Sequence, residues 1–108
     1  QIAYGVRRYT DETHRLYGVL DRRLADRDYV AGDYSIADMA IWPWILPAPQ
    51  GQDLAEFPHL KAWMDRVGER PAVKAGRAVG DELRSNLGAS GQSAEEARKL
   101  LFGQRARR

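Results

Sequence analysis

The sequence predicts an all-α fold, a helical bundle, and three observations support this class. Apolar residues recur at steps of three and four over several long stretches, the spacing that places them on one face of a helix. Pro58 and Pro71 each stand where a helix would start, a position at which the missing N–H costs nothing. No stretch alternates apolar and polar residues as a half-buried strand does. We therefore expect four main helices and a short C-terminal helix.

The composition is that of a single folded domain. The chain has 108 residues, of which 44% are hydrophobic, and this content is enough to form a core. No run approaches the roughly 20 apolar residues of a membrane span, so we expect no membrane partner. The absence of cysteine excludes disulfides and thiolate metal sites within the chain and is consistent with a cytoplasmic protein. A net charge of +2 is too small to indicate nucleic-acid binding.

The first predicted helix runs from Ile2 to Leu24. Gly5 and Gly18 each cost about 1 kcal/mol relative to alanine inside a helix, which favours a close neighbouring helix. Because no N-cap precedes Ile2 and the chain begins with Gln1, we expect a fragment or a processed product. The apolar face of this helix is formed by Ile2, Val6, Tyr9, Leu16, Leu20 and Leu24.

A capping box marks the start of the second helix. Ser35 is its N-cap and Asp38 follows three residues later, so each side chain can bond the other residue's backbone N–H. Tyr34 and Met39 occupy the two positions of a hydrophobic staple around this cap. Gly32 gives the chain the freedom to turn sharply into the helix.

The residues behind this cap are almost entirely apolar as far as Leu46. A helix that is apolar all round belongs in the centre of a domain, so we expect the segment from Ile36 to about Leu46 to be buried. Pro43 interrupts this helix because it removes one backbone hydrogen bond.

Two further helices follow. Pro58 starts the third, and Pro71 starts the fourth, which continues to Leu87. The buried stripe of the third helix consists of Phe57, Leu60, Trp63, Met64 and Val67. After a flexible joint, a second capping box at Ser93 opens a short helix that ends near Gly103. We therefore expect a helical domain over 1–87 and an extension with a basic tail over 88–108.

Few residues suggest chemistry by themselves. His14 and His59 lack a partner at the spacing of a zinc helix, so we interpret both as surface or packing residues and expect no metal. The capping role accounts for Asp38 without a catalytic one. Trp42, Trp44 and Trp63 are candidates for lining a ligand pocket, but aromatic residues on helices usually belong to the core. The residues alone indicate a helical domain and identify no catalytic residue.

Four segments, in this order and spacing, resemble the C-terminal domain of the glutathione S-transferase family. The four are Gly32-x-x-Ser35-Ile36-Ala37-Asp38, Trp42-Pro43-Trp44, Phe57-Pro58-x-Leu60-x-x-Trp63 and Arg70-Pro71-Ala72-Val73. A further segment is similar to the bacterial Nu-class and disulfide-bond-reductase-like members: Arg8-Tyr9-x-x-Glu12-Thr13-x-Arg15-Leu16-Tyr17. The resemblance covers Ile2 to Leu87.

The resemblance implies a function for the chain as part of a larger enzyme. In this family an N-terminal thioredoxin-like domain binds glutathione and activates its thiol, while the helical domain forms the second-substrate side of the site. The family's first C-terminal helix and the thioredoxin-like domain have no counterpart in this sequence, so the chain alone is expected to be inactive. The implied parent is a homodimeric transferase or disulfide-bond reductase that uses glutathione as a substrate.

By the same resemblance, Arg8 helps to hold glutathione at the cleft between the domains, with Tyr4 and Tyr9 beside it. Trp44 is a further expected substrate-binding residue. The alternative for Arg8 is a surface pair with Glu12 at i+4. The alternative for the whole domain is a non-catalytic protein-interaction module of the same fold, as used in translation elongation complexes and some aminoacyl-tRNA synthetases.

Overall fold

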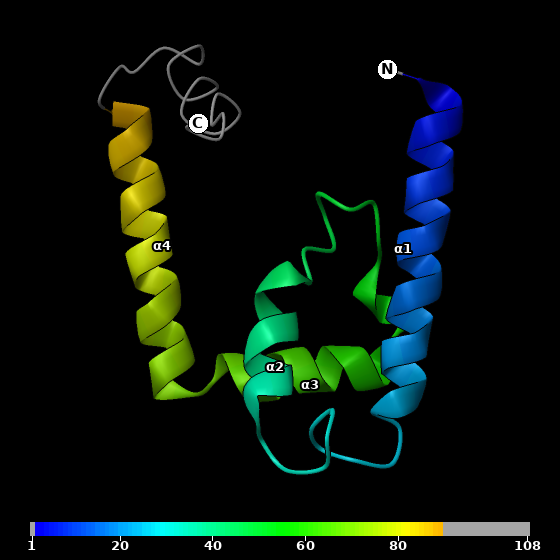
Figure 1. Cartoon of the computed structure of the whole chain (residues 1–108), viewed down its shortest axis with the longest axis horizontal. Coiled ribbons are helices and arrows are strands. Elements are labelled where there is room, and N and C mark those ends of the chain that lie inside the picture. Colours follow the sequence, from blue (N-terminus) through cyan, green and yellow to red (C-terminus); the bar gives the residue numbers. More distant parts are fainter. Residues whose placement is uncertain (1, 90–108) are drawn as a thin grey trace, which may run out of the picture. The chain divides into compact units, whose positions relative to one another are not determined.

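The structure, a computed structural model, describes residues 2–89 (Figure 1). It contains α1 (Ala3–Arg23), α2 (Ile36–Ile41), η1 (Trp42–Trp44), η2 (Leu54–Glu56), α3 (Pro58–Gly68) and α4 (Pro71–Ala89), where η denotes a 3-10 helix. The all-α prediction is confirmed over these residues, which hold no strand beyond two isolated bridges in the loop before α2. The predicted capping box at Ser93 and the short helix after it lie outside the described residues.

The chain divides into two compact units between Arg70 and Pro71. The second unit contains α4, which begins at Pro71 as the sequence predicts. Val79 and Leu83, four residues apart and therefore on one face, are both exposed. No helix in the described part of the chain is long and apolar enough to cross a membrane.

The core of the first unit forms where α1 and α3 pack together, with α3 beside the C-terminal half of α1 (Figure 1). Leu60, Trp63 and Val67 are fully buried, and their spacing places them on one face of α3. Tyr17 of α1 and Leu24, the C-cap residue that follows α1, also belong to this core. The buried stripe predicted for the third helix is therefore present, with Met64 at its half-buried edge and Phe57 buried just before the helix.

Asp21 of α1 caps the N-terminus of α3. Phe57, the residue at the N-cap position, makes no side-chain cap bond, and Pro58 has no N–H to satisfy. The carboxylate of Asp21 accepts from the N–H of Leu60 at 2.9 Å. A negative charge is also favoured at this end of the helix dipole. The Asp21 side chain therefore fixes the N-terminus of α3 next to α1.

The predicted central helix is wrong in extent and in burial. α2 ends at Ile41, and η1 replaces its last turn, because Pro43 cannot supply the N–H that an α-helix needs there. Ile36 is 81% exposed and Trp44 is 74% exposed. Within the described residues, the unit covers the Asp38 face of α2 and leaves its apolar faces open.

The segment between α1 and α2 turns sharply, and η1 packs closely against α3. Gly32 has a φ of +99°, a conformation that L side chains rarely adopt, as its predicted role requires. The indole N–H of Trp42 donates to the carbonyl of Met64 at 3.0 Å. A Cβ at Gly68 would lie 3.2 Å from the Trp42 ring, so glycine permits this close approach.

Candidate functional site

Asp38 is the polar centre of the first unit. Its Oδ2 accepts from the N–H of Ser35 at 3.1 Å, and the Ser35 side chain accepts from the N–H of Asp38, so both halves of the capping box are present. The Ser35 hydroxyl also accepts from the N–H of Ala37 at 3.2 Å. Its Oδ1 accepts from the indole N–H of Trp63 at 2.7 Å and from the N–H of Val30 at 3.1 Å. The side chain is fully buried. Because fixed donors occupy both oxygens, Asp38 joins three segments and has no oxygen facing solvent for acid–base chemistry.

The two residues at the staple positions have different surroundings. The ring of Tyr34 meets the edge of the Tyr29 ring, with centroids 5.4 Å apart. The Arg70 guanidinium lies 3.5 Å from the centre of the Tyr34 ring, a cation–π contact that ties the loop before α2 to the end of α3. Met39 is half exposed.

The N-terminal half of α1 carries a shallow surface depression of about 370 Å³. Two of the predicted substrate-binding residues, Tyr4 and Arg8, line it, whereas Tyr9 and Trp44 do not. We call this surface the α1 depression; its lining consists of Tyr4, Arg7, Arg8, Asp11, Glu12 and Arg15. Three arginines face two carboxylates there, which leaves one net positive charge.

Glu12 in the α1 depression is paired with Arg15, not with Arg8. The Arg15 guanidinium donates to both carboxylate oxygens, at 2.6 and 2.9 Å. These bonds from Arg15 lower the pKa of Glu12 below its ordinary value, and Arg8 adds a smaller electrostatic contribution. The proposed surface pair between Arg8 and Glu12 is therefore absent. Within the described residues no hydrogen bond or ion pair holds Arg8, so its planar set of donors is available to a ligand.

Apolar side chains extend along the exposed side of α1 around this depression. Tyr4 and Tyr9 are 74% and 72% exposed, although both are large and partly apolar. Further exposed apolar residues of α1 are Val6, Leu16 and Val19. The first unit therefore presents Arg8 next to exposed apolar side chains, and exposed apolar surface of this kind is typical of a binding face.

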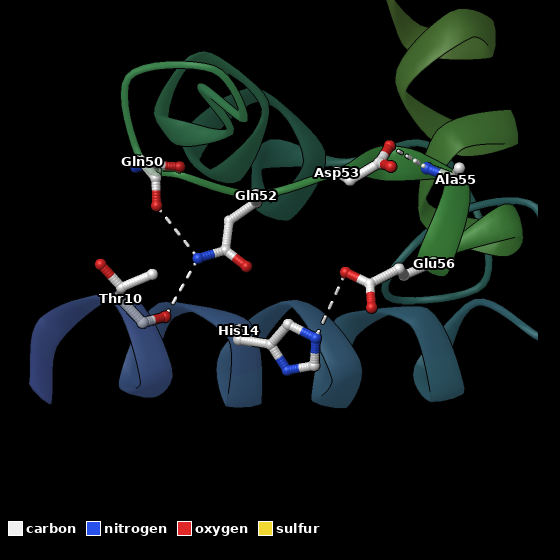
Figure 2. Close-up of polar contacts among 7 residues, drawn as sticks. All are labelled: Thr10, His14, Gln50, Gln52, Asp53, Ala55 and Glu56. Atoms are coloured by element: carbon white, nitrogen blue, oxygen red, sulfur yellow. Dashed lines mark hydrogen bonds and ion pairs between the residues drawn. The ribbon is translucent and has the colours of Figure 1, made fainter. Parts of the chain in front are cut away.

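The Gln52 side chain attaches the loop after η1 to α1 (Figure 2). The Gln52 side chain donates to the backbone carbonyls of Thr10 and Gln50, both at 3.0 Å. Nearby, the imidazole of His14 lies 3.5 Å from the carboxylate of Glu56. The His14 ring also meets the edge of the Phe57 ring. These contacts place the loop beside the middle of α1.

Gln50 makes three further side-chain bonds. Its Oε1 accepts from the hydroxyl of Tyr17 at 2.5 Å and from the N–H of Leu46 at 3.1 Å. Its Nε2 donates to the backbone carbonyl of Trp44 at 3.0 Å. Burial raises the pKa of the Tyr17 hydroxyl, which keeps it protonated and able to donate.

Sequence reasoning missed Gln50, Gln52 and Asp21, which fix loop and helix positions. A Pro-Ala-Pro-Gln-Gly run indicates a loop, but no local signal shows that a glutamine in it reaches a tyrosine 33 residues away. The same holds for Asp21, whose partner is 39 residues along the chain. In the part of the chain that the structure describes, no group of three or more metal-binding side chains comes together.

Comparison with known proteins gives consistent results. A family model described as "Glutathione S-transferase, C-terminal domain" matches residues 7–71. The disulfide-bond oxidoreductase YghU of Escherichia coli is 47% identical over 88 residues, which cover 73% of this chain and 31% of that protein. The disulfide-bond oxidoreductase YfcG of Escherichia coli is 44% identical over 89 residues, covering 81% and 39%.

A more distant relative is glutathione S-transferase 2 of Schizosaccharomyces pombe, 39% identical over 90 residues, with 68% of this chain and 39% of that protein covered. The chain thus spans between 31% and 39% of the length of these three curated relatives.

Proposed function

Because this chain belongs to the glutathione S-transferase family through its C-terminal helical domain, we propose that it forms the second-substrate side of a glutathione-dependent active site. The proposed reaction is disulfide reduction, which the names of YghU and YfcG favour, or glutathione conjugation. A thioredoxin-like domain would bind glutathione and activate its thiol, within a cytoplasmic homodimer. In this proposal the helical domain extends to Leu87, and residues 88–108 form an extension.

The observation that carries the proposal is the state of Arg8 in the α1 depression. Glutathione carries carboxylates, and a guanidinium can grip a carboxylate by two parallel hydrogen bonds. Arg8 is not paired with Glu12, because the Arg15 guanidinium binds both oxygens of the Glu12 carboxylate. The net positive charge of the depression adds an attraction for an anion. Tyr4 lines the same depression and supplies an apolar side.

The other two predicted substrate-binding residues have a different proposed role. Tyr9 and Trp44 lie outside the depression and are largely exposed. Large aromatic side chains left open to water favour contact with an apolar group. We therefore assign both to the second substrate and not to glutathione.

Replacing Arg8 with alanine in the complete protein is expected to weaken glutathione binding by about 1.5–3 kcal/mol, because a charge-assisted hydrogen bond is lost. This corresponds to roughly a 10- to 150-fold increase in Kd. Calorimetry measures it directly. Arg22→Ala is the matched control, since Arg22 is an exposed arginine of the same helix outside the depression. Unchanged glutathione affinity in a folded Arg8→Ala protein would leave Arg8 as a surface residue.

The isolated 108-residue chain is expected to show no turnover of a chromogenic electrophile or of hydroxyethyl disulfide with glutathione. It has no cysteine to act as a nucleophile, and groups that only bind substrates do not lower a chemical barrier. The complete protein, assayed in parallel, is the positive control. Turnover by the chain that scales with its concentration would contradict this prediction. A complete protein that binds another protein but shows no turnover would favour the interaction module instead.

A further inference from the structure

Hydrogen bonds hold the segment 44–50, which runs from the last residue of η1 into the loop after it. The N–H of Ile45 donates to the carbonyl of Trp42 at 3.2 Å, and the N–H of Gln50 donates to the carbonyl of Leu46 at 3.1 Å. The Gln50 side chain then bonds the backbone on both sides of Ile45, at Trp44 and at Leu46. The backbone that carries the Trp44 side chain therefore has little freedom to move.

This arrangement is anchored in the core through Tyr17. The Tyr17 side chain is buried, and its ring meets the edge of the Phe57 ring, with centroids 5.6 Å apart. Its hydroxyl donates to Oε1 of Gln50, so the Gln50 amide is oriented by a residue that cannot move without disturbing the core. The amide in turn directs its N–H₂ group at the carbonyl of Trp44. A chain of hydrogen bonds thus runs from the core to Trp44.

The indole at the end of this chain is open to water: Trp44 is 74% exposed. Trp63 is fully buried, and the indole N–H of Trp42 is bonded to Met64. A fixed backbone restricts the rotamers that a tryptophan samples, and a restricted indole offers a large contact area at little entropic cost on binding. Holding an exposed aromatic side chain in place gains nothing for the core, which indicates a role in recognition.

We propose that Gln50 is a positioning residue that holds Trp44 as a preformed flat surface for an apolar or aromatic group of the second substrate. This inference rests on the proposed function and deepens it. Gln50 itself touches no substrate; it acts through the Trp44 carbonyl, and Tyr17 acts through Gln50.

The first test follows the three tryptophans of the chain separately by 19F NMR after incorporation of 5-fluorotryptophan. The Trp44 resonance is assigned with Trp44→Phe. In Gln50→Ala the Trp44 resonance is expected to narrow and to shift toward that of free 5-fluorotryptophan, because its backbone is released. The Trp63 resonance is expected to stay in place and serves as the check that the core is intact.

Gln52→Ala is the matched control for this experiment. Gln52 attaches the same loop to α1 at Thr10 but makes no bond to Trp44. Its replacement is expected to leave the Trp44 resonance unchanged. Gln50→Glu is the second variant: it retains an acceptor for Tyr17 and Leu46 but cannot donate to the Trp44 carbonyl, so it is expected to move the Trp44 resonance as Gln50→Ala does. An unchanged resonance in both Gln50 variants, or an equal change in Gln52→Ala, would overturn the positioning role.

The second test is kinetic and uses the complete protein. In Gln50→Ala, loss of the two side-chain hydrogen bonds to the Trp44 segment is expected to raise KM for an aromatic second substrate about threefold to tenfold. The kcat and the KM for glutathione are expected to change less than about twofold, because the thiol chemistry lies elsewhere. Tyr17→Phe is expected to shift KM in the same direction.

The outcomes separate this role from the proposed function. An active protein whose second-substrate KM is unchanged in Gln50→Ala overturns the positioning role alone. A complete protein without turnover overturns the proposed function and this role together. Arg8→Ala, which addresses glutathione and not Trp44, is expected to leave the Trp44 resonance unchanged.

Discussion

Replacing Asp38 with alanine is expected to lower the free energy of unfolding by about 3–5 kcal/mol, because buried N–H groups lose their acceptor, each at a cost of about 1–3 kcal/mol. The carboxylate is fully buried and accepts from Trp63, Val30 and Ser35. Alanine leaves the indole N–H of Trp63 and the N–H of Val30 inside the protein without these partners. Urea unfolding followed by circular dichroism measures the loss.

Ser35→Ala is the matched comparison for Asp38→Ala, because it removes the other half of the same capping box. Its expected cost is about 1 kcal/mol, the usual value for an N-cap. Trp63→Phe, combined with Asp38→Ala in a double-mutant cycle, is expected to reveal a coupling energy between the two side chains. If Asp38→Ala costs no more than Ser35→Ala, the carboxylate is only a helix cap and its bond to Trp63 has no net effect.

Leu60→Ala is expected to destabilise the first unit by about 2–5 kcal/mol, the range for removing a buried leucine side chain and leaving a cavity. Leu60 is fully buried between α3 and α1, and its backbone N–H is the one that Asp21 caps. The surrounding core is therefore held on both sides and has little freedom to collapse into the space. The same urea titration provides the measurement.

Leu16→Ala on α1 makes the same chemical change at an exposed position and is the control. Its expected effect is within about 0.5 kcal/mol, as for most surface substitutions. Equal losses in the two variants would mean that Leu16 is covered in solution, by another domain or by a second copy of the chain. A small loss in Leu60→Ala would contradict the placement of the core between α1 and α3.

The features that the sequence predicted correctly are those with local causes. The starts of α3 and α4 follow from single prolines, because a proline at the first helical position needs no N–H partner. Ser35 as an N-cap depends on residues within one turn of each other. The family was also recognisable, because its segments retain their order and spacing.

The burial of α2 could not be predicted in the same way. Its apolar pattern predicts that other parts of the protein pack against the helix, but it does not say whether those parts belong to this chain. In the part of the chain that the structure describes, Ile36 and Trp44 have no such cover. Of the four predicted substrate-binding residues, the structure brings only Tyr4 and Arg8 into one depression.

The sequence by itself determined where α1, α3 and α4 lie, the start of α2 at its capping box, and the family, because propensity, proline chemistry and capping act over a few neighbouring residues. The tertiary structure alone decided which polar groups meet across the chain: Asp38 with Trp63, Asp21 with Leu60, and Tyr17 with Gln50. These pairs are separated by 25 to 39 residues, so no local pattern specifies them. They form because groups that packing removes from water must find partners inside the protein, and only the packed arrangement of the helices determines which partners are within reach.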